Sequence, residues 1–596
     1  MRSLWQRVKC RARAATAALG IVFAGLLPSI VADISYAGDI TPPPGIVAAS
    51  IEYTGRITVD GPPVTASIKT PKKNGLMVFD GVAGQRINIG FSGATLTQGR
   101  ASVYGPDGAL MSIVASPVTH YYWTAYKPAP DSMATKAASF SPKGGSLDLP
   151  ALPSSGTYTI VISPGESYTG DVTVTVSTEL TGEITPQGAA VPIAFGRFGQ
   201  NARYTFAGTT GQTVSLQLSG VTVESGYLSI LKPDGGVLGT PTSFGSQGAV
   251  IDTQVLPTSG TYAVLIDPGH VDLGHATLAL YNTPDISGTI LINEASVTST
   301  LSVPGQRARY TFNGTAGQWV NLGLTSVTTA SSVVSMLNPD GTTLVSTTVG
   351  PSGGSLDPAT MLPASGTYTI AVDPVGYNTG SMALTLTSPL IGTVSLDGPP
   401  VPINFTKPGS TARYTFSGAA GQWVNLGFSS VTVTSSTITL LNQDGTVLAS
   451  TTVGRGGGGL KAPSPLPATG TYTIVVDPTS THTGAITVTP STEVAGSVTI
   501  NTAPTPVMIS RAGQNARYTL AGPGNQQVTV KVTGNTFNGL TVSLYTRSGI
   551  LQTEMTRSET SFALNPVTLL TPDLYTITIS PMAPATGKLN LQVTSP

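Results

Sequence analysis

Charged residues are scarce in this chain: Asp, Glu, Lys and Arg together make up 10% of its 596 residues. Disordered chains also lack apolar residues, and the 40% hydrophobic content here excludes that class. Ser and Thr must therefore supply the polar surface. Together with 69 Gly and 46 Pro, this composition favours an extracellular β-sheet protein over a cytosolic enzyme.

Cysteine is nearly absent, because Cys10 is the single one. Cys10 precedes an apolar run, which is the wrong position for lipid attachment, and we expect it to be removed with a signal peptide. The mature chain then contains no disulfide, so packed cores alone must hold it together.

Histidine is also rare, and the four His do not recur at equivalent places along the chain. No nucleophile elbow or zinc-ligand spacing surrounds them. We therefore predict no catalytic residues, no metal ligands and no cofactor. His270 and His275 lie near Asp267 and Asp272, and a metal site there stays an alternative to a polar loop between two strands.

The N-terminus has the pattern of a secretory signal peptide. Five basic residues come first: Arg2, Arg7, Lys9, Arg11 and Arg13. An uncharged apolar run over residues 16–27 follows, and Ser35-Tyr36-Ala37 is typical of a cleavage site. We predict that residues 1–37 are removed; an uncleaved membrane anchor over residues 14–32 is the alternative.

Removal of residues 1–37 takes five of the 29 basic residues and one of the 29 acidic residues, which leaves a net charge of −4. No basic patch remains, so we expect no nucleic-acid partner and no binding to an anionic membrane surface. The predicted location is outside the cytoplasm: secreted, at the cell surface or in the periplasm, with no membrane span in the mature chain.

One stretch, LPASGTYTIAVDP over residues 362–374, recurs along the chain with small changes. Its tyrosines are Tyr158, Tyr262, Tyr368, Tyr472 and Tyr575, at spacings of 104, 106, 104 and 103 residues. A period of that length indicates one whole domain per repeat. The stretch itself predicts a turn followed by a half-buried strand, and a Tyr at that place resembles a tyrosine corner.

Two further motifs recur, and in modules 2–4 they keep a constant distance from this stretch. A strand with the sequence ARYTF or ARYTL begins at Ala202, Ala308, Ala412 and Ala516. Hairpin turns with Asp-Gly follow at Asp107, Asp234, Asp340 and Asp444. Each module then shows eight or nine short alternating strands, separated by turns and without a helical period, which is typical of a β-sandwich.

The predicted fold class is all-β, with five tandem jelly-roll/Ig-like β-sandwich modules of about 104 residues after a signal peptide. We place a linker at residues 38–54 and the modules at residues 55–181, 182–287, 288–391, 392–495 and 496–596. The linkers between modules are short, which favours a semi-rigid rod.

The Tyr-x-Phe strand, the Gly-rich turn with Gln, the Pro-Asp-Gly hairpin and Leu-Pro-x-Ser-Gly-Thr-Tyr resemble the bacterial pre-peptidase C-terminal (PPC) domain. The resemblance covers nearly all of the mature chain. It implies jelly-roll-like β-sandwiches of the kind appended to secreted proteases; relatives in collagenases bind collagen and calcium, and similar repeats occur in large bacterial surface and toxin-delivery proteins. No catalytic domain is attached here, so proteolysis does not follow.

Calcium binding is possible on this resemblance but is not supported by the spacing of ligands. Calcium requires six to eight oxygens, usually with several carboxylates. The hairpin Asp residues, such as Asp340, and the strand-end residues, such as Asp373, are isolated along the chain. We interpret them as turn residues, because turns favour Asp and Gly.

Aromatic residues form 6% of the chain, and those that break the repeat are the candidate ligand- or partner-binding residues. Module 1 carries a 23-residue insertion, within residues 116–143, that holds Tyr121, Trp123 and Tyr126. These side chains either contact a ligand or cap the module. Trp319 and Trp423 are predicted to face outward, where they stack on sugar rings, pack against a neighbouring module, or cover their own sheet or linker.

We therefore expect a non-enzymatic exported repeat protein that acts as a structural or adhesin-like binding rod at a cell surface. The alternative is a carbohydrate- or matrix-binding accessory protein that partners a separate secreted enzyme or toxin system. An extracellular polysaccharide or protein surface is the expected partner in both cases. A hydrolase with its site in the module 1 insertion is a third hypothesis.

Overall fold

The computed structural model describes residues 40–113, 137–165, 167–269 and 272–596. The expected signal peptide and the insertion residues Tyr121, Trp123 and Tyr126 lie outside these ranges. Strands dominate the described part, which also contains the short 3₁₀ helix η1 (Ala48–Ser50). None of its helices is long and apolar enough to cross a membrane.

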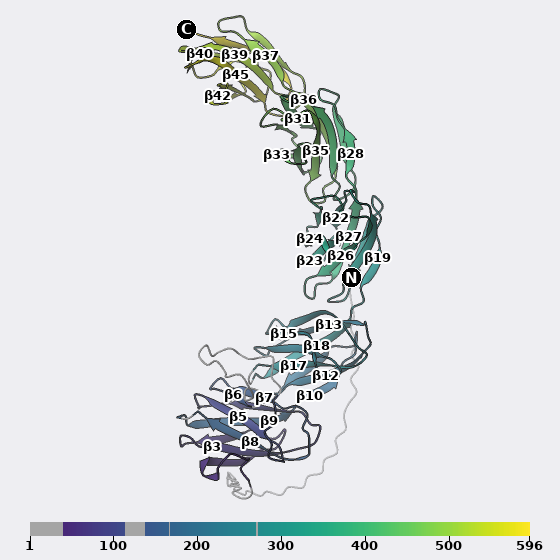
Figure 1. Cartoon of the computed structure of the whole chain (residues 1–596), viewed down its shortest axis with the longest axis vertical. Coiled ribbons are helices and arrows are strands. Elements are labelled where there is room, and N and C mark those ends of the chain that lie inside the picture. Colours follow the sequence, from purple (N-terminus) through teal and green to yellow (C-terminus); the bar gives the residue numbers. More distant parts are fainter. Residues whose placement is uncertain (1–39, 114–136, 166, 270–271) are drawn as a thin grey trace, which may run out of the picture. The chain divides into compact units, whose positions relative to one another are not determined.

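The strands follow one pattern five times (Figure 1). Repeat 1 contains β1 (Ile51–Arg56), β2 (Val64–Ile68), β3 (Asn74–Gly81), β4 (Ile87–Ser92), β5 (Gly99–Tyr104), β6 (Ala138–Phe140), β7 (Gly145–Asp148), β8 (Gly156–Pro164) and β9 (Gly170–Thr178). Repeat 2 contains β10 (Leu180–Glu183), β11 (Val191–Phe195), β12 (Ala202–Gly208), β13 (Thr213–Ser219), β14 (Gly226–Leu231), β15 (Val237–Phe244), β16 (Ala249–Val255), β17 (Gly260–Pro268) and β18 (Gly274–Asn282).

Repeats 3 and 4 have the same nine strands. Repeat 3 contains β19 (Ile286–Thr289), β20 (Val297–Leu301), β21 (Ala308–Gly314), β22 (Asn321–Thr325), β23 (Ser332–Leu337), β24 (Thr343–Val349), β25 (Gly354–Leu356), β26 (Gly366–Pro374) and β27 (Gly380–Thr387). Repeat 4 contains β28 (Leu390–Thr393), β29 (Val401–Phe405), β30 (Ala412–Gly418), β31 (Val424–Ser429), β32 (Ser435–Leu441), β33 (Val447–Gly454), β34 (Gly458–Lys461), β35 (Gly470–Pro478) and β36 (Gly484–Thr492).

Repeat 5 has one additional short strand. It contains β37 (Val494–Val498), β38 (Thr505–Ile509), β39 (Ala516–Pro523), β40 (Gln526–Thr533), β41 (Leu540–Tyr545), β42 (Leu551–Arg557), β43 (Phe562–Ala563), β44 (Val567–Leu569), β45 (Pro572–Pro581) and β46 (Gly587–Thr594).

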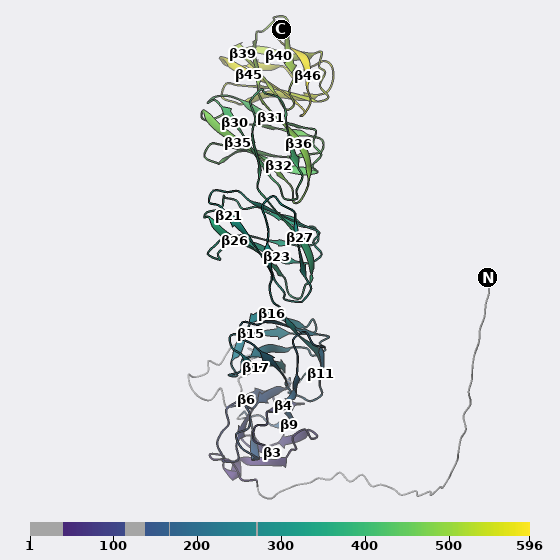
Figure 2. The same ribbon diagram turned by 90° about the vertical axis from the view of Figure 1, so that its right-hand side faces the viewer.

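Each repeat divides its strands between two sheets. In repeat 3 the five-stranded sheet has the order β19-β21-β26-β23-β24, and the four-stranded sheet has the order β20-β27-β22-β25. Figure 2 shows β21 and β26 on one side of this repeat and β27 on the other. The chain crosses between the sheets repeatedly. The second strand lies in the opposite sheet, and the third returns to lie beside the first.

The first and third strands of each repeat run parallel. In repeat 3, Ile286 of β19 pairs with Ala308 of β21, and the same parallel pair occurs in the other four repeats. All other strand pairs of repeats 2–5 are antiparallel except an isolated bridge between Ile500 and Val593. A parallel pair requires a crossover, and here the second strand supplies it.

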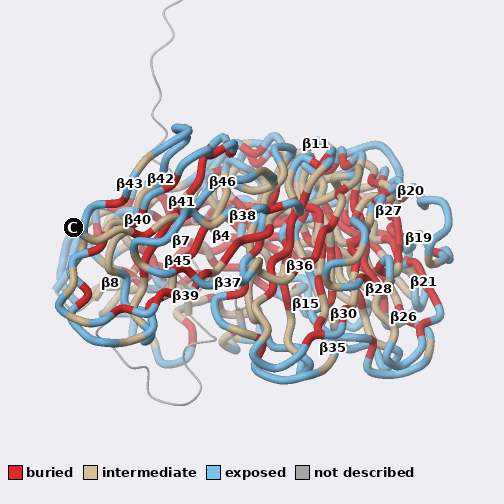
Figure 3. Tube along the Cα trace, turned by 90° about the horizontal axis from the view of Figure 1, so that it is seen from above, coloured by how far each residue is buried: buried red, intermediate tan, exposed pale blue. Residues whose placement is uncertain are grey.

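Apolar side chains from both sheets fill a core inside each repeat. In β26, Tyr368, Ile370 and Val372 are fully buried, and the residues between them are not. They pack against Leu322 of β22 and Leu384 of β27 in the opposite sheet. Figure 3 shows buried residues along the strands and exposed residues at the turns.

The recurring tyrosine bonds to the backbone before its own strand, as predicted. Its hydroxyl donates to the carbonyl oxygen four residues upstream, at distances of 2.6, 2.7, 2.8, 2.7 and 3.1 Å in repeats 1–5. In repeats 1–4 its ring also stacks on the Phe of the third strand, with centroids 5.3–5.6 Å apart. The tyrosine-corner interpretation is therefore confirmed.

The predicted fold class, five separate jelly-roll/Ig-like β-sandwich modules, is wrong. Jelly-roll and immunoglobulin sheets are antiparallel, and the parallel first pair in every repeat breaks that topology. The repeats are also not separate, because the structure forms two compact units, and Glu179–Pro596 belongs to one of them. Repeats 2–5 form a continuous stack in which neighbours pack on one another, the arrangement of repeat and solenoid proteins.

Replacing Tyr472 by Phe should lower the local stability of repeat 4 by about 1 kcal/mol, because the carbonyl of Ala468 loses its hydrogen-bond donor. Amide hydrogen exchange of β35 in the full chain should then become about fivefold faster. Peptides from β26 of repeat 3, where Tyr368 is intact, provide the internal control. Unchanged exchange in β35 would show that the hydroxyl contributes nothing.

Candidate functional site

The junctions between repeats 3 and 4 and between repeats 4 and 5 share one feature, a close approach of two backbones. The turn before the third strand of one repeat contacts the fourth strand of the preceding repeat. A Cβ on Gly409 would lie 2.6 Å from the Cα of Gly323, and a Cβ on Gly513 would lie 2.5 Å from the Cα of Gly427. A side chain does not fit at these four positions, since real Cβ contacts are longer.

The junction between repeats 2 and 3 makes the same approach with hydrogen bonds. Ser215 of β13 donates its hydroxyl to the carbonyl oxygen of Pro304 at 2.6 Å, and Thr253 of β16 donates to the carbonyl oxygen of Gly305. Gly305 has a positive φ of 78°, as do its counterparts Gly409 and Gly513 at 72°. The turn therefore needs glycine for its conformation as well as for the lack of a Cβ.

Trp319 and Trp423 lie at two of these junctions. The guanidinium of Arg413, in repeat 4, lies 4.2 Å from the ring centroid of Trp319 in repeat 3. Arg517, in repeat 5, lies 3.8 Å from the ring centroid of Trp423 in repeat 4. Each Trp thus makes a cation–π contact with the next repeat, which is one of the three arrangements the sequence allowed. Whether either residue also binds a partner stays a prediction.

An acid of the preceding linker holds most of these arginines in place. Glu493 accepts 2.6 and 3.4 Å hydrogen bonds from Arg517, and Glu179 and Asp285 pair with the equivalent Arg203 and Arg309. In each pair the acid stands 24 residues before the arginine. Position 389 is Pro, so Arg413 has no acidic residue 24 positions before it. Burial lowers the pKa of Arg413.

Each junction also contains a second polar cluster, and the residues that form it differ from one junction to the next. Between repeats 2 and 3, Arg307 lies between two carboxylates, 2.7 Å from Asp252 of repeat 2 and 3.0 Å from Asp373 of its own repeat. Burial raises the pKa of Asp373, and the charge of Arg307 opposes this shift. One cation therefore stabilises two half-buried anions.

Between repeats 3 and 4 the arginine is missing. Thr411 occupies its place and donates a 3.1 Å hydrogen bond to the Asn321 side-chain oxygen. The Asn321 amide nitrogen donates in turn to Asp357, at 2.6 Å. The second carboxylate of this junction is Asp477, whose pKa rises to about 6 because of burial first and the charge of Asp357 second.

Between repeats 4 and 5 the carboxylates themselves are missing. Lys461 stands in the place of Asp357, and Ser580 in the place of Asp477. Asn515 donates a 2.7 Å hydrogen bond to the buried Asn425. Burial lowers the pKa of Lys461, and the nearby Glu493 opposes the shift.

Repeat 5 carries an exposed Lys531 in β40, at the position that Gly427 has in β31. The pairing fixes this correspondence, since Gly427 pairs with Thr489 of β36, and Lys531 pairs with Gln592 of β46. The counterpart in repeat 2 is Gln217, which pairs with Ala279 of β18, so repeats 2 and 5 carry a side chain where repeats 3 and 4 have glycine.

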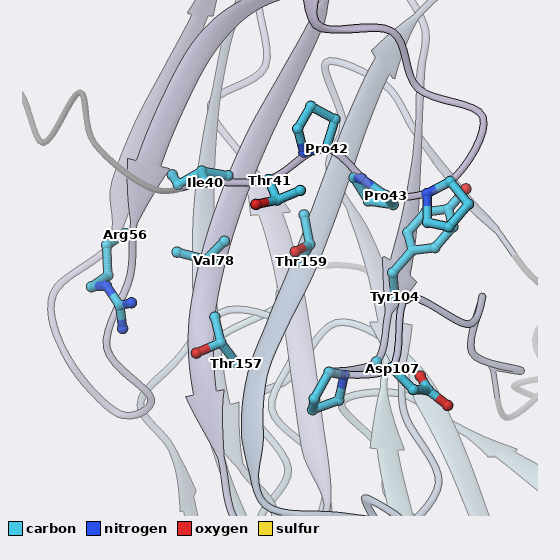
Figure 4. Close-up of a pocket in the computed structure, with 14 residues that line it drawn as sticks. Ile40, Thr41, Pro42, Pro43, Arg56, Val78, Tyr104, Asp107, Thr157 and Thr159 are labelled. Carbon is cyan, nitrogen blue, oxygen red and sulfur yellow. The ribbon is translucent and has the colours of Figure 1, made fainter.

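Repeat 1 contains a cleft of about 960 Å³, which sequence reasoning missed. Its floor is the outer face of the five-stranded sheet, with Val78, Thr159 and Tyr104, and its cover is the segment from Ile40 to Pro44. Figure 4 shows this segment crossing above the strands that carry Val78 and Thr159. Pro43 is buried, so the segment packs on the repeat. In the sequence, the run Thr-Pro-Pro-Pro shortly before β1 is the feature that could have indicated this packed segment.

The hairpin aspartates act as turn residues, as predicted. Asp340 Oδ1 accepts a 2.9 Å hydrogen bond from the backbone N–H of Thr342, and the equivalent Asp residues of repeats 1, 2 and 4 accept the same bond. The bonds from Thr342 lower the pKa of Asp340. Across the described ranges, no three His, Cys, Asp or Glu side chains gather in a metal-binding group.

The predicted binding residues are not brought together by the described structure. Trp319 and Trp423 lie at successive junctions of the stack. Tyr121, Trp123 and Tyr126 lie outside the described residues. Sequence reasoning identified the two tryptophans but not their arginine partners, because the contact joins residues about 94 positions apart in the sequence.

Comparison with known proteins adds little. No family model and no curated protein matches the chain. Among solved structures, it is similar to a periplasmic g-type lysozyme inhibitor, PliG of Aeromonas hydrophila, at 15% identity and a TM-score of 0.14 over 17% of this chain and 98% of that one. It is also similar to a biofilm-associated protein's BSP domain, at 11% identity and a TM-score of 0.11 over 69% of this chain and 99% of that one. Scores this low carry no inference about fold or function.

Replacing Gly427 by Ala should open the junction between repeats 4 and 5, because the new Cβ would collide with the carbonyl oxygen of Ala512. Overpacking of this kind costs about 1–3 kcal/mol. In the full chain, with the other tryptophans replaced by Phe, Trp423 should become more accessible to acrylamide. Gly456→Ala is the matched control, since a Cβ there meets nothing within 4 Å. Equal quenching in both variants would contradict the tight junction.

Proposed function

We propose that this chain is a non-enzymatic structural repeat protein, exported and used as a stiff, adhesin-like rod at a cell surface. The observation that supports this most is the recurring junction of the stack, where backbone meets backbone and a Trp–Arg pair joins successive repeats. Proteins that carry a binding surface away from a cell need junctions that resist bending. The resemblance to PPC domains supports the same class of extracellular protein and stays a prediction.

Short connections contribute to this stiffness. Two residues separate β27 from β28, and one residue separates β36 from β37. Connections of one to three residues leave a chain little conformational freedom between packed units. Side chains reach across them as well: Lys407 of repeat 4 donates to the carbonyl oxygens of Asn293 and Glu294 in repeat 3.

Arg511 makes the equivalent contact at the next junction. It donates to the backbone carbonyls of Asp397 and Gly398 in repeat 4, from the turn that precedes β39 of repeat 5. Charge-assisted bonds to carbonyl oxygens are stronger than neutral ones. Several contacts therefore join the repeats at each junction, which supports a mechanical role.

The binding end of the protein is proposed to be the aromatic insertion of repeat 1, which its four siblings lack. Replacing Tyr121, Trp123 and Tyr126 together by Ala should abolish pull-down on the polysaccharide or collagen that the intact chain retains. The melting temperature should stay within a few degrees, since the four sibling repeats fold without this insertion.

Trp319→Ala with Trp423→Ala serves as the contrasting variant. It should keep binding and lose stability, because each indole leaves an arginine without its cation–π partner. The opposite pattern, with binding lost in the junction variant and kept in the loop variant, would move the binding surface to the stack.

The second candidate function, a carbohydrate-binding accessory protein, is favoured by the cleft of repeat 1. Tyr104 offers an aromatic face, Thr157 and Thr159 offer hydroxyls, and Arg56 offers a donor next to Asp80, at 2.5 Å. Clefts of roughly 300–1,000 Å³ are usual for small ligands. Sugar rings fit this combination of ring stacking and hydrogen bonding.

Tyr104→Ala should weaken binding of soluble oligosaccharides at least tenfold in calorimetry if this cleft binds sugar. Tyr545→Ala is the matched control, because Tyr545 ends β41 of repeat 5 as Tyr104 ends β5 of repeat 1. Equal affinities for the two variants would exclude the cleft as the sugar site.

A further inference from the structure

The carboxylate clusters at the first two junctions of the stack are built from equivalent positions, which the strand register fixes. Asp373 follows Val372, the partner of Ala308, and Asp477 follows Val476, the partner of Ala412. Arg307 directly precedes Ala308, and Thr411 directly precedes Ala412. The two junctions therefore differ at the centre of the cluster, where one has a cation and the other a hydroxyl, and at a neighbouring position, where Ser215 of the first junction corresponds to Asn321 of the second.

The other carboxylate is equivalent as well. Asp252 follows Ile251, which pairs with Leu216, and Asp357 follows Leu356, which pairs with Leu322. At the first junction the two acids share Arg307. At the second, Asp357 of repeat 3 and Asp477 of repeat 4 occupy the equivalent positions without it.

The remaining neighbours of Asp477 supply no compensating charge. Its own strand β35 offers Val475, and the partner strand β32 offers Thr437. The cation on the neighbouring strand β30, Arg413, lies over the ring of Trp319 instead. The turn after β35 carries His482, whose backbone N–H bonds to Thr479.

Asp357 is held more firmly than Asp477. It accepts the 2.6 Å hydrogen bond from Asn321, and burial nevertheless raises its pKa. Asn321 also accepts the bond from Thr411, so that Asp357 is linked to repeat 4 through a chain of two hydrogen bonds. Charging both acids puts like charges on the two sides of this link, which is unfavourable in a half-buried site.

We propose that the junction between repeats 3 and 4 is a proton-operated joint, closed while Asp477 is protonated and loosened when Asp357 and Asp477 are both ionised. This goes beyond the proposed structural role, because it makes one joint of the stack responsive to the acidity of its surroundings. The junctions on either side are expected to respond less to the same change: at one, Arg307 pairs with both acids and opposes the rise in the pKa of Asp373, and at the other, Lys461 and Ser580 replace the acids.

The direction of the pH effect follows from the linkage between protonation and folding. Asp has an unfolded pKa of about 3.9, and the folded pKa of Asp477 is raised to about 6. A raised folded pKa gives a contribution that is fully present below about pH 4 and is lost as the pH rises through about 6. A difference of about two pKa units corresponds to roughly a 100-fold change in the closed-to-open ratio between pH 4 and 8.

The chain carries its own reporters for the test. Trp319 lies at the joint and Trp423 lies at the next junction, so that single-tryptophan versions of the full chain report on each separately. Acrylamide quenching of Trp319 should rise in one step centred near pH 6. Quenching of Trp423 should be constant from pH 4 to 8.

Three further substitutions, made in the chain whose single tryptophan is Trp319, test which group causes the pH-dependent step. Thr411→Arg restores the arginine of the first junction and should remove the step. Asp477→Asn should also remove it and keep quenching low at every pH, and it stands as the second measurement if the arginine variant does not fold. His482→Gln should keep the step, because the imidazole is not its source.

Four results would overturn the proposal. They are the absence of a step in the parent chain, a step that survives Asp477→Asn, a step that His482→Gln removes, and an equal step at Trp423. A Trp319 signal that ignores pH and responds to millimolar calcium chloride alone would overturn it too, since the two acids would then hold a metal cation and not a proton.

Discussion

The contact on which the stack depends is backbone against backbone, at Gly409 on Gly323 and at Gly513 on Gly427. Dispersion attraction falls off steeply with distance, so two chains that meet without side chains bring many atoms into contact at once. The approach also brings other groups within reach: the arginine that covers a tryptophan, the amides that bond across the boundary, and the acids whose charges meet. Each of these secondary contacts presupposes that the glycines admit the neighbouring turn.

The local features of each repeat were readable from the sequence. Alternating residues such as Tyr368, Ile370 and Val372 specify a half-buried strand, and the glycine turn before them specifies the tyrosine's hydrogen bond. The hairpin aspartates were interpreted correctly for the same reason, since their partners lie two residues away. Interactions of short sequence separation leave their pattern in adjacent residues.

Topology and junctions were not readable. The parallel pair of β19 with β21 joins residues 22 positions apart, and no alternation pattern distinguishes it from an antiparallel pair. A glycine inside a strand usually weakens it, so nothing in the sequence marks Gly323 and Gly427 as the residues that admit the next repeat. The outward position of Trp319 was predicted correctly, and its partner Arg413 was not, since it comes from another repeat.

Lys531 has a consequence for how such a chain changes length over evolutionary time. Tandem repeats multiply by unequal recombination, which copies a whole unit together with both of its contact faces. A duplicated repeat 4 would bring Gly427 with it and could be inserted in register on either side of the original. A duplicated repeat 5 would present Lys531 to its own copy, and that junction would have to form through side chains, as the one between repeats 2 and 3 does at Gln217. Expansion of the gene is therefore expected to copy the glycine-bearing units more readily than the lysine-bearing one.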